Sequence, residues 1–542
     1  MLASLGCVVG LRHRGEPDQS MRWWTLAALC CGMTTIVMDS TILNVALPTL
    51  VTSLGASSSQ LQWIVDAYTL VFAGLLLASG SLGDRYGRRR MLNIGVGLFI
   101  ATSVAGALQT TAVGLIACRC LTGIAGSMIM PSTLSILANV FREQRERGRA
   151  IGIWSAFGTV GVAAGPIIGG LLLRNFSWSA VFWVNVPIGL LALIATYYAV
   201  PESKNDRAGA LDPIGAVLSI AGMVGVLYSI IEAPARGWAS HQVLGGGLSG
   251  VVFIGVFVVW ELRRSSPMLD VRYYRNRRFT AANSAVTLAF FALFGSLFLM
   301  TQFWQFVKGY TALEVGVRLI PYAASMAISS PVSSVLVNRL GSRTVMIVGF
   351  TLSSCSFFGL SHLHVDSSYP RVIVNMLLTG VGIGLSLPPV TAAIMGSLPR
   401  QHAGVGSAVN DATRNIGGAL GVAVVGSIMA STYVRGVSER LSGSGLSDLD
   451  FSSVRNGLGN ALSMASTADP AMRLQVTMAA RESFVDGFSN GMLCSSGVML
   501  VAAVLTAALL PGRAIEHEYV HTAPDPTAPV QSVVTGPSNT DR

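Results

Sequence analysis

The chain has 542 residues, of which 51% are hydrophobic and only 11% are charged. Soluble domains carry about 25% charged residues, so this chain cannot cover a water-exposed surface and should face lipid over most of its area. A formal net charge of +10 would also suit a nucleic-acid-binding protein, but the placement of the basic residues argues against that class.

Fourteen apolar segments reach the length of about 20 residues that a membrane-spanning helix needs. The basic stretch Arg12–Arg14 before the first of them resembles a signal peptide, but the apolar run is too long and has no small-residue cleavage pattern. The spans are expected at 23–47, 60–80, 91–108, 113–137, 149–171, 180–199, 213–231, 244–261, 281–304, 314–336, 344–361, 371–395, 404–430 and 488–511.

Loop charge tests this count independently, because short cytoplasmic loops are rich in Lys and Arg. With the N-terminus inside, the inside loops hold most of the basic residues, including Arg88–Arg90, Arg142–Arg149 and Arg263–Arg278. If one central helix had been missed, the basic loops that follow it would fall on the outside, and the alternation of basic and less basic loops would be lost. We therefore expect a multi-pass protein of the cell membrane with both termini cytoplasmic, whose positive charge marks the cytoplasmic face and not a nucleic-acid site.

Two polar segments lie outside the spans. Residues 431–487 are rich in Gly, Ser and Ala and are expected to form an external loop with a short helix near 469–482. The end of the chain, 513–542, is rich in Pro and Thr and is expected to be a disordered cytoplasmic tail.

The loop after the second span carries a cluster of Gly, Asp and Arg that matches the loop after the tenth. Residues 84–89 read Asp-Arg-Tyr-Gly-Arg-Arg, and residues 338–343 read Asn-Arg-Leu-Gly-Ser-Arg, as expected of a duplicated transporter. Glycines allow a tight turn, and the aspartate can pair with an arginine, so the cluster could latch one conformation; the alternative is a plain positively charged anchor. The latch residues are Gly80, Gly83, Asp84, Arg85, Gly87, Arg88 and Arg89.

Charged residues within spans are expensive and are therefore candidates for proton coupling or substrate binding. Five are singled out: Asp39, Asp66, Arg119, Asp411 and Arg414. A structural hydrogen-bond hub remains the alternative for Arg119, and a solvated position near the outer interface remains the alternative for Asp66. Asp411 and Arg414 lie three residues apart on one helix face, where a purely structural ion pair is the alternative.

The fifth span carries small residues at three- and four-residue spacing, which lets helices pack backbone to backbone. The set is Gly158, Gly161, Gly165, Pro166, Gly169 and Gly170. Other chemistry finds no support in the sequence. Neither lysine, Lys204 or Lys308, stands in a phosphate-binding loop, and no zinc or nucleophile motif is present, so we expect no enzyme, no ATP site, no metal and no cofactor.

These motifs together resemble the major facilitator superfamily, and within it the fourteen-helix drug:H⁺ antiporters of the quaternary-ammonium and multidrug exporter type. The resemblance covers residues 20–511 and includes Asp39 to Pro48, Gly80 to Arg90, Arg119 to Pro131, Gly158 to Gly170 and Trp178 to Gly189. At a position in the tenth span where these exporters have an acidic residue, this chain has Met326, which puts recognition of divalent organic cations in doubt.

The resemblance implies an all-α fold of two six-helix bundles with an inserted helix pair. We expect an N-terminal tail at 1–20, bundles at 21–200 and 266–512, the inserted pair at 201–265 and the C-terminal tail at 513–542. The expected function is proton-driven efflux of hydrophobic or cationic drugs or antibiotics, by a monomer in the lipid bilayer. The alternatives are transport of one endogenous metabolite, or a passive channel or membrane sensor.

Overall fold

The computed structural model describes residues 19–141, 143–204, 212–264, 267, 271–397, 403–442 and 446–510, and every regular element in these ranges is helical. The predicted tails therefore lie almost wholly outside the described residues. The first half contains α1 (Gln19–Leu54), α2 (Ser58–Tyr86), α3 (Arg88–Ala107), α4 (Ala112–Val140), α5 (Gln144–Asn175), α6 (Ala180–Trp183) and α7 (Asn185–Ala199).

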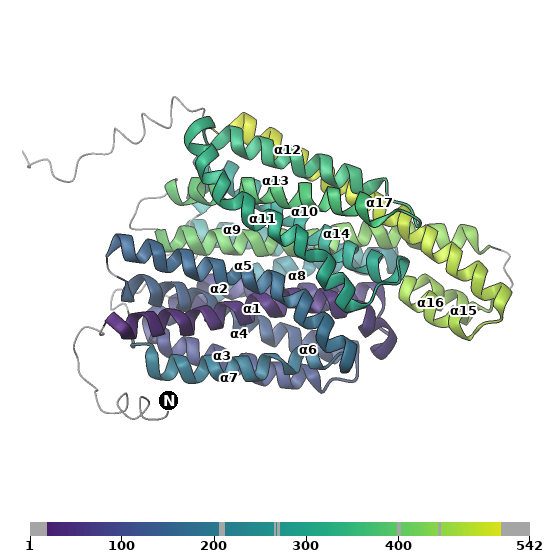
Figure 1. Ribbon diagram of the computed structural model, residues 1–542, viewed down its shortest axis with the longest axis horizontal. Coiled ribbons are helices and arrows are strands. Elements are labelled where there is room, and N and C mark those ends of the chain that lie inside the picture. Colours follow the sequence, from purple (N-terminus) through teal and green to yellow (C-terminus); the bar gives the residue numbers. More distant parts are fainter. Residues whose placement is uncertain are drawn as a thin grey trace, which may run out of the picture.

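A pair of helices, α8 (Pro213–Arg236) and α9 (His241–Arg263), leads to the second half. The second half contains the 3₁₀ turn η1 (Val271–Arg275), α10 (Arg277–Gln302), the π-helical turn η2 (Phe303–Val307), α11 (Ala312–Leu340), α12 (Ser342–Ser361), α13 (Tyr369–Gly396), α14 (Ala403–Arg440), α15 (Asp448–Arg455), α16 (Leu458–Thr467) and α17 (Pro470–Leu509). Figure 1 shows the long helices running side by side, with α3, α6 and α7 on one side and α12, α13 and α17 on the other.

Within the described ranges, 12 helices are long and apolar enough to cross a membrane. Helix α2, which bends by 52° between Ser58–Leu76 and Ala78–Tyr86, makes a thirteenth. Each of the fourteen predicted spans falls on a helix, and α6 and α7 together account for one of them. Helix α5, however, is not among the helices that are long and apolar enough to cross a membrane. The all-helical membrane fold is confirmed, and the count of fourteen is consistent with it and stays a prediction.

The two halves repeat the same helix pairings. Helix α1 packs on α5, α2 on α4 and α3 on α4, while α10 packs on α14, α11 on α13 and α12 on α13. The repeated loops also match in backbone: Gly87 ends α2 with φ of 111° and Gly341 ends α11 with φ of 85°. Because glycine alone adopts such positive φ values without steric cost, the short sequence repeat marks a repeat of local geometry.

The halves meet along two helix pairs, α5 with α11 and α2 with α14. We call the end of the molecule where α1 ends and α2 begins the distal end. There Gln305 of η2 donates its Nε2 to the carbonyl oxygen of Val45 in α1, at 3.0 Å. Gly170, near the end of α5, faces the backbone of Leu313 at the start of α11. Both contacts tie the halves together at the distal end.

Helix α8 contacts both halves at their α2–α14 seam. Trp63 of α2 donates its Nε1 to Glu232 of α8 at 3.3 Å, and Ser427 of α14 donates its hydroxyl to the carbonyl oxygen of Ile230. Helix α9 packs on the outer side of α8 and leaves most of its residues exposed. The pair is therefore fastened mainly through α8, across the line where the halves meet, while Arg272 of η1 also donates to the carbonyl oxygen of Leu262 in α9 at 3.1 Å.

The prediction of a long loop at 431–487 is wrong for most of its length, because most of this segment is helical, but the helix expected near 469–482 is present as the start of α17. Helix α14 continues to Arg440, α15 and α16 follow at the distal end (Figure 1), and α17 begins at Pro470 and not near the predicted span start. Asp469 caps α17 by accepting hydrogen bonds from two backbone amides. A search for apolar runs misses such helices, because their sequences are too polar to resemble spans.

Candidate functional site

Asp39 of α1 and Arg119 of α4 form a buried ion pair in the first half. Arg119 Nη1 donates to Asp39 Oδ2 at 2.6 Å, and each side chain is 2% exposed. Asn185 of α7 donates its Nδ2 to the other carboxylate oxygen at 2.7 Å. Charge-assisted hydrogen bonds of this kind are what a buried charge needs to be tolerated in an apolar interior. Three helices thus converge on one carboxylate.

Arg119 also connects this centre to α2. Its Nε donates to the carbonyl oxygen of Ile64 at 3.2 Å, and its guanidinium lies 4.5 Å from the ring centre of Tyr68. Removing one partner from such a pair leaves an uncompensated charge, at a cost of about 3–5 kcal/mol. The hydrogen-bond hub expected as the alternative for Arg119 therefore exists in the structure, and a coupling role for the same residue stays a prediction.

Asn185 was not among the predicted site residues. It stands in the sequence Val-Asn-Val-Pro at 184–187, which was recognised only as part of the family resemblance. The signal that could have identified it is an amide side chain in the middle of an apolar span, since such a group needs a buried partner. Its Nδ2 also lies 3.4 Å from the hydroxyl of Ser103 in α3.

Asp66 of α2 is enclosed but unpaired. Its exposed fraction is 0%, and neither carboxylate oxygen has a hydrogen-bond partner within the described residues. The alternative that Asp66 is solvated near the outer interface is therefore wrong. Gln62, one turn earlier, is buried and has no partner for either amide atom. It lies against Gly426 of α14, so this unpaired group adjoins the seam between the halves.

The expected ion pair between Asp411 and Arg414 does not form. Arg414 of α14 instead donates its Nη2 to the Thr391 hydroxyl of α13 at 2.9 Å, and its guanidinium lies 5.2 Å from the ring centre of Phe290 in α10. The spacing does place both residues on one face of α14. However, the long arginine side chain reaches a hydroxyl and a ring on neighbouring helices, which sequence spacing could not reveal.

The loop cluster pairs Asp84 with Arg88, as the sequence suggested. Arg88 Nε and Nη2 each lie 2.8 Å from Asp84 Oδ1, and Arg88 Nη1 donates to the carbonyl oxygen of Ser135 in α4 at 3.3 Å. Arg89 donates its backbone N–H to Glu202, after α7, at 3.1 Å. These contacts keep the loop on the first half in this conformation. A latch to the second half stays a prediction.

The remaining members of the cluster bring helices together or stand at the surface. A Cβ atom at Gly80 would lie 3.6 Å from the side chain of Pro131, and one at Gly83 would lie 3.6 Å from the hydroxyl of Ser132. Both glycines therefore face α4. The guanidinium of Arg85 lies 5.8 Å from the ring centre of Tyr86, its own neighbour in the chain.

The small residues of α5 pack it between α1 and α11. Along one face of α5, a Cβ at each glycine would meet a residue of α1; the glycines are Gly158, Gly161, Gly165 and Gly169. At Gly165 this Cβ would lie 2.9 Å from the backbone nitrogen of Ile42. The carbonyl group of Pro166 lies against Gly316 of α11, and Gly170 faces Leu313. The small residues thus permit backbone-to-backbone contact on two sides.

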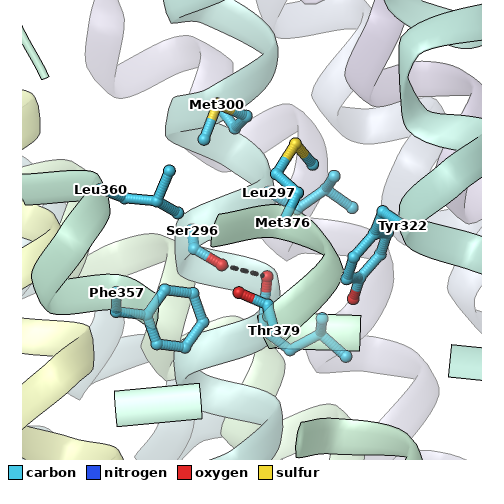
Figure 2. Close-up of a pocket in the computed structure, with 9 residues that line it drawn as sticks. Ser296, Leu297, Met300, Tyr322, Phe357, Leu360, Met376 and Thr379 are labelled. Atoms are coloured by element: carbon cyan, nitrogen blue, oxygen red, sulfur yellow. Dashed lines mark hydrogen bonds between the residues drawn. The ribbon is translucent and has the colours of Figure 1, made fainter. Parts of the chain in front are cut away.

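A pocket lies within the second half, away from the charged residues of the first. Its lining comes from α10, α11, α12 and α13 (Figure 2), and consists of Leu293, Ser296, Leu297, Met300, Tyr322, Phe357, Leu360, Met376 and Thr379. None of these side chains is charged. Met326, the residue that departs from the exporter pattern, lies one turn after Tyr322 on α11 and is half-buried. Sequence reasoning did not identify this pocket, because its residues resemble ordinary core positions.

Comparison with known proteins supports the family expectation. A family model described as "Major Facilitator Superfamily" matches residues 29–422. The methyl viologen resistance protein SmvA of Salmonella typhimurium is 34% identical over 484 residues, which cover 89% of this chain and 97% of that protein. The multidrug resistance protein Stp of Mycobacterium tuberculosis is 36% identical over 407 residues, covering 75% and 76%. The tetracenomycin C resistance and export protein of Streptomyces glaucescens is 35% identical over 419 residues, covering 77% of each.

Solved structures agree on the fold alone. The inward-facing, unoccupied bacterial homologue of the human lysosomal transporter Spinster matches with a TM-score of 0.63 at 16% identity, over 92% of this chain and 100% of that chain. The partially occluded inward-open xylose transporter XylE from E. coli matches with a TM-score of 0.56 at 13% identity, over 92% and 99%.

Proposed function

The chain belongs to the major facilitator superfamily, and we propose that it exports hydrophobic or cationic drugs or antibiotics across the cell membrane in exchange for protons. Three of its relatives carry names that describe resistance to methyl viologen, resistance to several drugs, and resistance to and export of tetracenomycin C. They cover most of this chain, which supports the transfer of small-molecule efflux to it.

The main support for proton coupling is that the carboxylate of Asp39 is paired, whereas the carboxylate of Asp66 is not. Asp39 has its charge balanced by Arg119 and is held by Asn185. Asp66, two helical turns from the distal start of α2, has no such partner in the described structure. An enclosed carboxylate without a partner is costly as an anion, so it gains from binding a proton or a cationic substrate. One acidic site that takes either ligand, but not both, is sufficient for exchange.

The orientation follows from loop charge. With both termini cytoplasmic, the distal end faces outside, and the contacts at Gly170 and Gln305 close the outer side. The substrate would then bind from the inside, and a proton would replace it when the molecule opens outward. The transporter works as a monomer in the bilayer and takes its energy from the proton gradient, without ATP, metal or cofactor.

The coupling is tested by ethidium efflux from cells, measured with and without a protonophore. We expect efflux from wild-type cells to stop when the gradient collapses. Asp66→Asn keeps the shape of the side chain and removes its charge, so it should abolish efflux at an unchanged protein level in the membrane. Asp366→Asn, at an exposed position between α12 and α13, makes the same change of side chain and is a matched control that should leave efflux intact.

Two results would contradict the proposal. Efflux that continues without the gradient would remove proton coupling, and wild-type efflux from the Asp66→Asn variant would remove this carboxylate from the mechanism. Failure of the wild type to export ethidium or any other drug, together with export of one metabolite in a competition screen, would support the alternative of a dedicated metabolite transporter.

A further inference from the structure

Gln62 of α2 is a second enclosed polar group beside Asp66, and the exchange proposed above does not use it. Its exposed fraction is 1%, and neither its amide nitrogen nor its amide oxygen has a hydrogen-bond partner within the described residues. Gln62 and Asp66 lie one turn apart on the same face of α2. Because buried polar side chains normally have a partner, two unpaired side chains at this spacing need an explanation.

The amide of Gln62 is packed against the other half of the molecule. A Cβ atom at Gly426 of α14 would lie 2.8 Å from Gln62 Nε2 and 2.9 Å from Gln62 Cδ, so a larger residue there would collide with the amide. One turn after Asp66, Leu70 is buried in an apolar cluster with Ala419 and Ala423 of α14. Asp66 therefore lies between two residues that face the seam between α2 and α14.

Helix α8 covers this part of the seam. Its residues Leu227 and Ile231 belong to the same cluster as Leu70 and are at most 1% exposed. The face of α2 that carries Gln62 and Asp66 is thus enclosed by apolar residues of α14 and α8.

The charged side chains on neighbouring helices do not compensate Asp66. On α2 and the helices packed against it, Asp39 is paired with Arg119, Asp84 with Arg88, and Glu232 with Arg236. The part of α14 that faces Gln62 and Leu70 lies within residues 415–430, which include no charged residue, and Asp411 and Arg414 precede it. A charge on Asp66 is therefore uncompensated while the seam is closed.

Parting of the halves at the distal end changes the surroundings of both side chains. It moves Gly426 away from Gln62 and leaves the amide free to turn toward Asp66. A glutamine that precedes an aspartate by four residues on a helix can donate a hydrogen bond to its side chain. Such a bond is stronger when the carboxylate is charged than when it is neutral. Gln62 therefore gains a partner in the open seam, and that partner is best when Asp66 is ionised.

We propose that Gln62 is a positioning residue for the exchange: it donates to ionised Asp66 when the halves part at the distal end, and it loses this hydrogen bond when they close. The proposal rests on the function proposed above and deepens it, because it names the group that stabilises the charged site. Charged Asp66 then keeps the distal end open until a proton neutralises it. Exchange requires such a block, since closing around an empty charged site would uncouple transport from the proton.

The test measures distal opening in purified protein held in nanodiscs, as the fraction of long distances between two spin labels. The labels are placed at Leu108 and Leu474, two exposed residues on opposite halves, in a background without the native cysteines. In the wild type, the ratio of open to closed molecules should rise with pH as Asp66 becomes charged. In Asp66→Asn the ratio should not depend on pH. These two results test the proposed coupling through Asp66.

The role of Gln62 is tested by Gln62→Met, which keeps the length of the side chain and removes its amide. The variant should lower the open-to-closed ratio at every pH, because it removes an unpaired amide from the closed seam. At alkaline pH the fall should be about 2- to 5-fold larger than at acidic pH, because the open state then also loses a hydrogen bond to a charged carboxylate. This excess should vanish in the Asp66→Asn background.

A matched control is Gln302→Met in α10. Gln302 is buried like Gln62, but its amide donates to the carbonyl oxygen of Phe298 at 3.2 Å, so its loss should give no pH-dependent excess. Gln62→Leu repeats the measurement with a second apolar side chain, in case Gln62→Met does not fold.

The outcomes separate the role of Gln62 from the proposed function. If opening depends on pH through Asp66, but Gln62→Met lowers the ratio equally at acidic and alkaline pH, the role of Gln62 is overturned and the proposed coupling stands. An excess that persists in the Asp66→Asn background would also overturn it. If opening of the wild type does not respond to pH, or responds equally in Asp66→Asn, the proposed coupling through Asp66 fails, and the role of Gln62 fails with it.

Discussion

Replacing Gly170 by alanine should open the distal end of the molecule. An added Cβ would lie 2.7 Å from the backbone nitrogen of Leu313 and 2.8 Å from the carbonyl oxygen of Ala312, both in α11. Backbone atoms cannot move aside as a flexible side chain can, so α5 and α11 must separate by about 1 Å to reach ordinary contact. Overpacking of this kind costs about 1–3 kcal/mol. This steric overlap is relieved when the two halves move apart at the distal end. The equilibrium should therefore shift about 5- to 150-fold toward the distally open state.

The shift can be measured as a distance distribution between spin labels on the two halves. Leu108, at the end of α3, and Leu474, near the start of α17, are exposed and lie on opposite halves. In a background without the seven native cysteines, Gly170→Ala should add a longer distance that the wild type lacks. Gly97→Ala in α3, where nothing lies within 4 Å of the added Cβ, is the control. Identical distributions for the two variants would refute the reasoning.

Two further predictions concern stability. Arg119→Leu leaves Asp39 buried without its partner and should lower the free energy of unfolding by about 3–5 kcal/mol, read as a fall in the thermal midpoint of the purified protein. The double variant with Asp39→Asn should recover part of that loss, and equal midpoints for the single and double variants would show that the pair is not coupled. Gly87→Ala forces a positive φ of 111° on a residue with a Cβ and should cost about 1–2 kcal/mol. A midpoint equal to that of Gly97→Ala would contradict the backbone argument.

The membrane fold could be predicted from the sequence because its physical signals are local. A span is a run of apolar residues, and the lipid requires such a run to be helical. The packing role of the small residues of α5 could also be predicted from the sequence, because backbone contact needs glycine at helical spacing. The helices within residues 431–467 could not be predicted from the sequence. Their polar sequences resemble loops, and caps such as Asp469 are recognised as caps only when the following helix is already known.

The site was predicted in part, for a different reason. Each charged residue within a span was visible in the sequence, but its partner depends on which helices adjoin. Asp39 and Arg119 are 80 residues apart and meet because α1 and α4 pack together. Asp411 and Arg414 are neighbours in sequence and do not pair, because α10 and α13 offer Arg414 other partners. Sequence spacing therefore identified candidate charges but not the pairs they form.

The most direct test of the account is transport by purified protein in liposomes, driven only by an imposed pH gradient. With the lumen acidic and ethidium outside, exchange of lumenal protons predicts that wild-type proteoliposomes concentrate ethidium, and that proteoliposomes with Asp66→Asn do not. Ethidium uptake that is equal with and without the gradient, or equal in the two proteins, would contradict proton-coupled export through this carboxylate.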